Sequence, residues 1–126
     1  MQKINRYFDL SHEELKKILY FYGPVTVSFE AKKDFFFFKG LGIYSECPAR
    51  TRVSQINHAV LLIGWTESGD WIIKNSWGTE WGNQGFAIIS KERDCGIRMF
   101  VEVLEVVGAG PPNIFECGNG RIEEGE

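Results

Sequence analysis

The sequence contains no long apolar run and no cluster of basic residues. Its longest apolar stretches, such as residues 59–63, are far shorter than the roughly 20 residues that a membrane-spanning helix requires. The first six residues lack the apolar core of a secretory signal peptide, so we expect any targeting signal to lie outside this segment. The net charge is −3, and no group of adjacent lysines and arginines exceeds a pair. We therefore expect neither membrane insertion nor a nucleic-acid partner.

Cysteine and histidine are also scarce, which limits the possible metal sites and disulfides. The three cysteines are Cys47, Cys95 and Cys117, and the two histidines are His12 and His58. No two cysteines form a CxxC pair, and none has a zinc-site spacing to a histidine. We expect no structural metal and no cofactor. An odd number of cysteines is compatible with one disulfide and one further thiol that pairs outside this segment.

The composition is that of a folded domain with one modest core. Of its 126 residues, 44% are hydrophobic and 14% aromatic, which argues against a disordered segment.

Ser11 and Glu14 form a capping-box pattern, in which each side chain accepts a hydrogen bond from the other residue's backbone N–H. An apolar stripe with helical spacing follows, made of Leu15, Ile18, Leu19 and Tyr22. Because Gly23-Pro24 cannot continue a helix, we predict a helix that starts after Ser11 and stops at Gly23.

Short strands are predicted along the rest of the chain. Residues 25–29 alternate between apolar and polar with the period of a strand. Residues 59–63 indicate a fully buried strand, and residues 71–74 and 85–90 indicate two more. Residues 100–107 alternate again. Short strands after a single helix predict a mainly β fold with one N-terminal helix, whose antiparallel sheet curls toward a barrel.

Four consecutive phenylalanines occupy residues 35–38. In neither a helix nor a strand can four neighbouring side chains point the same way. Several must be buried, and we expect others to face a second domain that this chain does not contain. The alternative is a short turn packed entirely on the chain's own core.

The character of the sequence changes after Val107. Residues 108–112 are linker-like, and residues 116–126 are acidic, rich in glycine and poor in apolar side chains. We place a domain boundary within residues 107–110, which divides the chain into units 1–107 and 108–126.

Two side chains are candidates for chemistry, His58 and Asn75. His58 stands at the start of the strand predicted at 59–63, and Asn75 directly follows the strand predicted at 71–74. Antiparallel pairing of the two strands would let the Asn75 amide oxygen accept the imidazole N–H. Such a contact fixes the orientation of a ring that acts in acid–base catalysis. A hydrogen bond with a purely structural role is the alternative that spacing alone leaves open.

Residues 57–61 and 71–85, which read NHAVL and WIIKNSWGTEWGNQG, resemble the histidine and asparagine boxes of the papain/cathepsin family of cysteine proteases. Upstream, residues 23–27, 35–40 and 42–44 resemble the preceding segment of that family, and downstream DCGI at 94–97 resembles its final cysteine motif. The resemblance covers about residues 7–104. It implies the fold of the family's right-hand, C-terminal half.

The resemblance assigns roles to the matching positions. His58 would form an ion pair with the cysteine thiolate and protonate the leaving amine, and Asn75 would orient His58. Trp77 would shield their hydrogen bond from solvent, and Trp81 would border the leaving-group side of the cleft. A substrate pocket would be lined by Ser28, Ile56, Ala59 and Phe100. The same resemblance implies a disulfide between Cys47 and Cys95, with two free buried thiols as the alternative in a reducing compartment.

The nucleophile of the family is missing from this chain. It sits in a box of the form Gln-x-x-x-Cys-Gly-x-Cys-Trp, and none of Cys47, Cys95 and Cys117 has such a context. The glutamine that stabilises the oxyanion belongs to the same absent half. We expect the chain alone to be inert toward peptides. Its partner would be an N-terminal half that carries the cysteine, either a separate chain or part of the same precursor.

Residues 116–126 resemble the opening of a cysteine-rich extracellular repeat, with a polar disordered end as the alternative. If the repeat interpretation holds, Cys117 pairs beyond residue 126 and the setting is oxidising. We therefore expect the secretory pathway, either extracellular or lysosomal and vacuole-like. Two functions remain open: half of a peptidase that hydrolyses peptide bonds, or a non-catalytic protease-like interaction domain of a larger modular extracellular protein.

Overall fold

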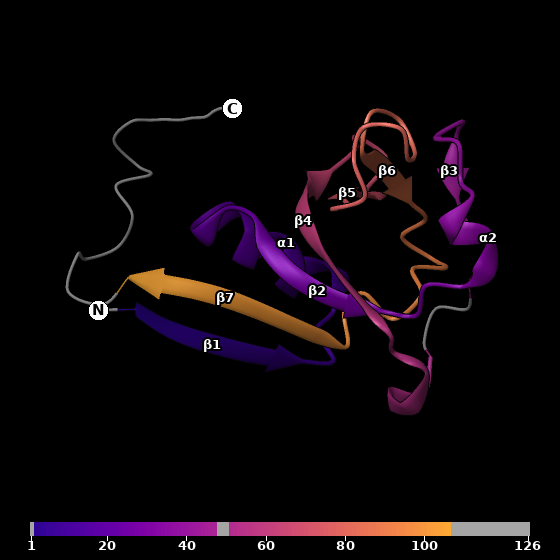
Figure 1. Ribbon diagram of the computed structural model, residues 1–126. Coiled ribbons are helices and arrows are strands. Elements are labelled where there is room, and N and C mark those ends of the chain that lie inside the picture. The colour runs from indigo at the N-terminus through magenta and orange to yellow at the C-terminus, as the bar shows by residue number, and fades with distance from the viewer. Residues whose placement is uncertain (1, 48–50, 107–126) are drawn as a thin grey trace.

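The structure is a computed structural model that describes residues 2–47 and 51–106. Within these residues seven strands form one sheet, in the order β1-β7-β2-β4-β5-β6-β3. Figure 1 shows β1 and β7 paired at one end of the molecule, with α2 and β3 at the other. The elements in chain order are β1 (Gln2–Phe8), α1 (His12–Tyr22), β2 (Val25–Phe29), α2 (Lys33–Phe36), β3 (Ile43–Tyr44), the 3-10 turn η1 (Val53–Gln55), β4 (His58–Trp65), β5 (Trp71–Lys74), β6 (Phe86–Ile89) and β7 (Phe100–Val106).

The predicted helix is confirmed as α1, and both halves of its capping box are present. Ser11 Oγ accepts the Glu14 N–H at 3.0 Å, and Glu14 Oε1 accepts the Ser11 N–H at 2.8 Å. The helix ends at Gly23, whose φ of 85° requires glycine and whose N–H donates to Leu19 O. Caps at both ends therefore define this helix as the sequence predicted.

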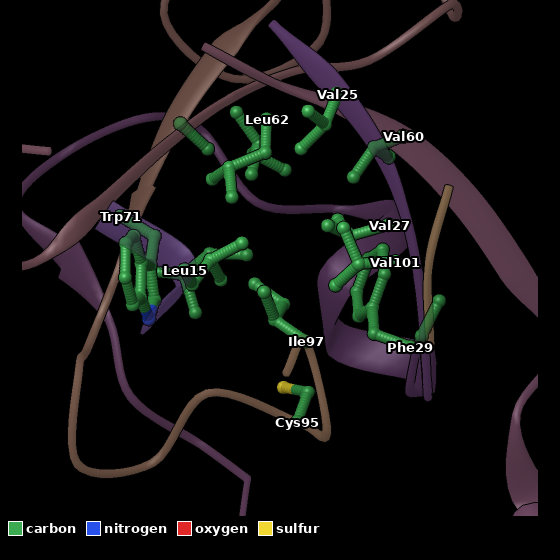
Figure 2. Close-up of a cluster of buried hydrophobic side chains, with 14 of the residues drawn as sticks. Leu15, Val25, Val27, Phe29, Val60, Leu62, Trp71, Cys95, Ile97 and Val101 are labelled. Atoms are coloured by element: carbon green, nitrogen blue, oxygen red, sulfur yellow. The ribbon is translucent and has the colours of Figure 1, made fainter. Parts of the chain in front are cut away.

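The core lies between α1 and one face of the sheet. Leu15 and Leu19 of α1 are buried there, and α1 packs against β4. Figure 2 shows Leu15 beside Trp71, with side chains from β2, β4 and β7 gathered around Ile97. Because α1 covers only this face, the strands can bury only alternate side chains.

The expectation of a fully buried strand at 59–63 is wrong. Val60 and Leu62 are buried, but Ala59 and Leu61 are exposed on the opposite face of β4. Nothing in the described residues covers that face. The run of apolar residues therefore predicted the strand correctly, but it did not predict that one face of the strand is exposed.

The mainly β fold is confirmed, with two additions. The strand β1 precedes the helix and pairs with β7 in antiparallel register. The short strand β3 runs parallel to β6, while the remaining pairs are antiparallel. The strands predicted at 25–29, 71–74, 85–90 and 100–107 correspond to β2, β5, β6 and β7. The sheet is thus mixed, although its central strands are those that the sequence indicated.

The disulfide between Cys47 and Cys95 is present and joins positions 48 residues apart. The phenylalanine block forms the helical turn α2. Phe35 is fully buried, whereas Phe36 and Phe37 are 49% and 70% exposed. The block is therefore not packed entirely on its own core.

The domain boundary at 107–110 and the tail at 116–126 lie outside the described residues. In the part of the chain that the structure describes, no helix is long and apolar enough to cross a membrane.

Candidate active site

The register of the sheet brings His58 and Asn75 together. His58 opens β4 opposite Phe29 of β2, and Asn75 follows the last residue of β5. Because β4 and β5 pair antiparallel, both side chains reach the same end of the sheet. His58 Nε2 lies 3.0 Å from Asn75 Oδ1, the contact that the spacing predicted.

Ser76 determines which atom of the Asn75 amide faces the imidazole. The Ser76 backbone N–H donates to Asn75 Oδ1 at 2.8 Å, and only the oxygen of the amide can accept. His58 Nε2 must then carry a proton, which it donates to the same oxygen. The other ring nitrogen, Nδ1, is left as the one that can exchange a proton with a reacting group.

Asn75 is buried, with 4% of its surface exposed, and its backbone N–H donates to Gly85 O. Its side-chain nitrogen Nδ2 is enclosed and has no hydrogen-bond partner in the described part of the chain. A buried amide donor without a partner costs about 1–3 kcal/mol. The site therefore keeps an oriented amide at a cost in stability, which is typical of functional positions.

Aromatic rings enclose the pair. The Trp77 ring stacks on His58 with centroids 4.6 Å apart and planes inclined by 27°. Trp81 meets Trp77 edge to face at 5.6 Å, and its indole N–H donates to Phe35 O at 2.8 Å. Trp77 is thus placed to shield the His58–Asn75 hydrogen bond, and Trp81 supports Trp77.

The four residues predicted to line a pocket lie together. Ser28 of β2 pairs with Ala59 of β4 on one side and with Phe100 of β7 on the other. All three line a hollow of about 480 Å³, and Ile56 contributes to the same hollow. Phe8 of β1, opposite Phe100, extends the row with an edge-to-face ring contact at 5.4 Å. Phe100 therefore faces the hollow, while its neighbour Val101 enters the core.

Two contributions were missed by the sequence analysis. Phe29 packs edge to face on His58 at 5.7 Å, and Phe36 stacks on Trp77 at 4.7 Å. The phenylalanine block carried the signal for Phe36, but only the fold shows that it lies beside the candidate site.

The helical turn that presents Phe36 is anchored to β3. The Tyr44 hydroxyl donates to Asp34 Oδ1 at 2.7 Å. Burial, followed by this hydrogen bond, raises the pKa of Tyr44 above its usual range. The phenol therefore keeps its proton, and its hydrogen bond to Asp34, at alkaline pH values where an ordinary tyrosine begins to ionise.

No thiol lies beside His58 in residues 2–47 and 51–106. Both cysteines of that part of the chain are joined in the disulfide, and Cys117 lies outside it. The same residues contain no group of three or more His, Cys, Asp or Glu side chains that could hold a metal ion. The described residues thus present an oriented imidazole, an indole stacked on it and a hollow, but no thiol beside them.

The fold is that of a papain-like protease domain. The family model described as papain family cysteine protease matches residues 1–104. The chain therefore belongs to the papain family.

Among curated relatives, mouse pro-cathepsin H is 39% identical over 80 residues, covering 60% of this chain and 24% of that protein. Mouse cathepsin K is 38% identical over 92 residues, covering 69% and 27%. The solved structure of digestive procathepsin L2 proteinase from the larval midgut of Tenebrio molitor matches with a TM-score of 0.68 and 30% identity. That match covers 82% of this chain and 33% of the other. The chain thus spans about a quarter to a third of these relatives.

Proposed function

We propose that this chain is the C-terminal half of a papain-like cysteine peptidase. It supplies the histidine and asparagine of a Cys-His-Asn site for peptide-bond hydrolysis, and it is inert without an N-terminal half that carries the cysteine. The observation that carries the proposal is the oriented pair: Asn75 Oδ1 accepts hydrogen bonds from both Ser76 N–H and His58 Nε2–H.

The uncovered face of the sheet supports the need for a second half. On β1 and β7 the paired residues Ile4 and Leu104 are 52% and 59% exposed, and Phe8 is 57% exposed. Leu61 of β4 is 39% exposed on the same face. These apolar side chains flank the exposed Arg6–Glu102 ion pair on the same face. Exposed apolar side chains gathered around polar groups in this way are typical of an interface. We propose that the cysteine-bearing half packs here and brings its thiol to His58 Nδ1.

In the assembled site, His58 would exchange one proton at Nδ1 throughout the reaction. It takes the thiol proton, the thiolate attacks the peptide carbonyl, and the imidazolium then protonates the leaving amine. In the second step His58 removes a proton from water, which hydrolyses the thioester. Asn75 holds the ring orientation at Nε2 throughout, and Trp77 keeps water from their hydrogen bond. The family's setting implies a secreted or lysosomal compartment, in keeping with the disulfide.

A chimera tests the proposal. The part of mouse cathepsin K that precedes the matched segment is joined to this full chain, and hydrolysis of a fluorogenic peptide is measured. We expect activity and labelling by a thiol-reactive epoxide, with His58→Ala lowering kcat by about 10²–10⁴-fold. The chain alone should show neither.

A folded chimera that binds the peptide but hydrolyses nothing would favour the non-catalytic interaction domain instead. Labelling of the chain alone would contradict its dependence on a second half.

A further inference from the structure

Two lysines converge near the end of β4 that is opposite to His58. Lys16 extends from α1, and Lys91 follows β6. Both side chains cover the buried Gly69: a Cβ atom placed on that glycine would lie 3.6 Å from Lys16 Nζ and 3.6 Å from Lys91 Nζ. The two positive charges therefore lie within about twice that distance of each other, and they repel each other.

The partners of these ammonium groups in the described residues compensate the two charges only weakly. Lys91 Nζ donates to a neutral acceptor, the Ser68 carbonyl oxygen, at 2.6 Å. Lys16 Nζ lies 3.5 Å from Glu13 Oε2, and the Glu13 side chain is 78% exposed, so water competes for this ion pair. Each ammonium group has three donors. An anion that accepts hydrogen bonds from both lysines would relieve their repulsion.

Two exposed aromatic rings flank Lys16. The centroid of the Trp65 ring lies 5.8 Å from Lys16 Nζ, and 36% of the surface of Trp65 is exposed. Tyr20 is 80% exposed and follows Lys16 by four residues on α1, so the two side chains share a face of the helix. The apolar C–H face of a sugar ring can pack on such rings, while a sulfate group accepts hydrogen bonds from the lysines.

This combination fits a sulfated sugar better than other anions. An inorganic ion would use the lysines but not the rings. A nucleic acid would require more basic residues than a chain of net charge −3 without a basic cluster offers. The disulfide indicates an oxidising setting, in which sulfated polysaccharides occur. We propose that Lys16, Lys91 and Trp65 bind a sulfate group and the adjoining sugar ring of a sulfated polysaccharide.

The sugar site is separate from the candidate active site. His58 opens β4 and Trp65 closes it, so their backbones are about 23 Å apart at the rise of a strand. A bound polysaccharide would retain the protein on a matrix and leave the cleft at His58 open. The inference therefore goes beyond the proposed function and does not depend on it.

Titration of the full chain tests the inference without any catalysis. N-acetylglucosamine 6-sulfate, N-acetylglucosamine and inorganic sulfate are each added to the chain, and the indole N–H signal of Trp65 is followed by NMR. Only the sulfated sugar contacts both the lysines and the ring, so it should bind at least about fivefold more tightly than either of the others. Its affinity should fall as the salt concentration rises.

Single charge variants identify the residues that bind the sulfate. Lys16→Gln and Lys91→Gln should each weaken binding of the sulfated sugar by about two- to fivefold. Glu13→Gln should strengthen binding, because the carboxylate that competes for Lys16 is gone. Lys17→Gln is the matched control: Lys17 is exposed on α1 next to Lys16, but consecutive helix residues face different directions. It makes the same change in net charge and should leave the affinity unchanged.

Several results would overturn the inference. Equal binding of the sulfated and the neutral sugar would exclude a role for the lysines, and equal binding of the sulfated sugar and inorganic sulfate would exclude a role for the ring. No binding of the sulfated sugar, or an equal loss in Lys17→Gln and Lys16→Gln, would also contradict it. Tighter binding of a short oligonucleotide than of a heparin oligosaccharide with the same number of charges would assign the lysines to nucleic acid instead.

Discussion

At the scale of single residues, Asn75 carries two opposing requirements. Its oxygen accepts from Ser76 and His58, which orients the imidazole. Its nitrogen is buried without a partner in the described residues, and such a group destabilises the fold. A residue selected for stability alone would not leave this donor unpaired, so stability and activity should respond differently to its removal.

We predict that Asn75→Ala changes stability little but lowers activity. Truncation removes both the favourable acceptor contacts and the unpaired Nδ2, and these effects offset each other within about 1 kcal/mol. In the assembled enzyme, loss of ring orientation should lower kcat by about 10- to 100-fold. Urea denaturation of the chain and kinetics of the chimera measure the two quantities.

Asn83→Ala serves as the control for this prediction, because the Asn83 side chain is exposed and lies outside the ring system. It should affect neither quantity. An Asn75→Ala enzyme with unchanged kcat would show that the His58–Asn75 contact is only structural.

At the scale of elements, α2 and β3 show how short segments can fix a site. Tyr44 of β3 is 3% exposed, contacts the Phe35 and Phe38 rings, and donates to Asp34 of α2. The two segments are too short to be stable alone. The contacts between α2 and β3 stabilise both segments, and they thereby keep Phe36 in place beside Trp77.

The Tyr44 phenol should make stability depend on pH in the alkaline range. The pKa of Tyr44 in the folded chain is raised above the ordinary value near 10. Above pH 10 the folded chain therefore retains the phenol proton, whereas the unfolded chain loses it. The stabilisation is fully present below pH 10 and is lost as pH rises. For one proton, the free energy of unfolding should fall by about 1 kcal/mol between pH 9 and pH 11.

Tyr44→Phe should lack this loss, and Tyr20→Phe, at a residue that is 80% exposed, should retain it. Both are compared with the parent chain by urea denaturation in a Cys117→Ser background, which prevents thiol exchange. If the free energy of unfolding of Tyr44→Phe still falls by the same amount between pH 9 and pH 11, another titrating group causes the fall.

Many of the helices and strands could be predicted from the sequence. The helix α1 could be, because its capping box, its apolar stripe and its terminal glycine all lie within a few residues of one another along the chain. The pairing of His58 with Asn75 followed from strand spacing. β1 could not be predicted, since its partner β7 lies at the far end of the described chain and its own residues 2–8 are largely polar. The exposed face of β4 was also missed, because an apolar run does not show which of its side chains face the core.

At the scale of the whole molecule, the disulfide joins the segment after β3 to the segment before β7. It ties the region of α2 and β3 to the strand that carries Phe100. Removing it as Cys47→Ala/Cys95→Ala should lower the free energy of unfolding by about 4 kcal/mol, because the disulfide closes a loop of 48 residues. Urea denaturation measures this loss, and dithiothreitol should reproduce it in the parent chain.

Cys117→Ala provides the comparison and should leave the midpoint unchanged. A double variant within 1 kcal/mol of the parent chain would mean that the sheet holds these segments without covalent help.

The pairing of β1 with β7 has a consequence for engineering. Gln2 lies opposite Val106 in their register, so the polypeptide enters and leaves the sheet at neighbouring points, as Figure 1 shows. A short linker could join residue 106 to residue 2, and new termini could be placed in the exposed turn at residues 67–68, between β4 and β5. Such a circular permutant would preserve every strand pair. It would also allow a second half to be tethered from a different side of the sheet.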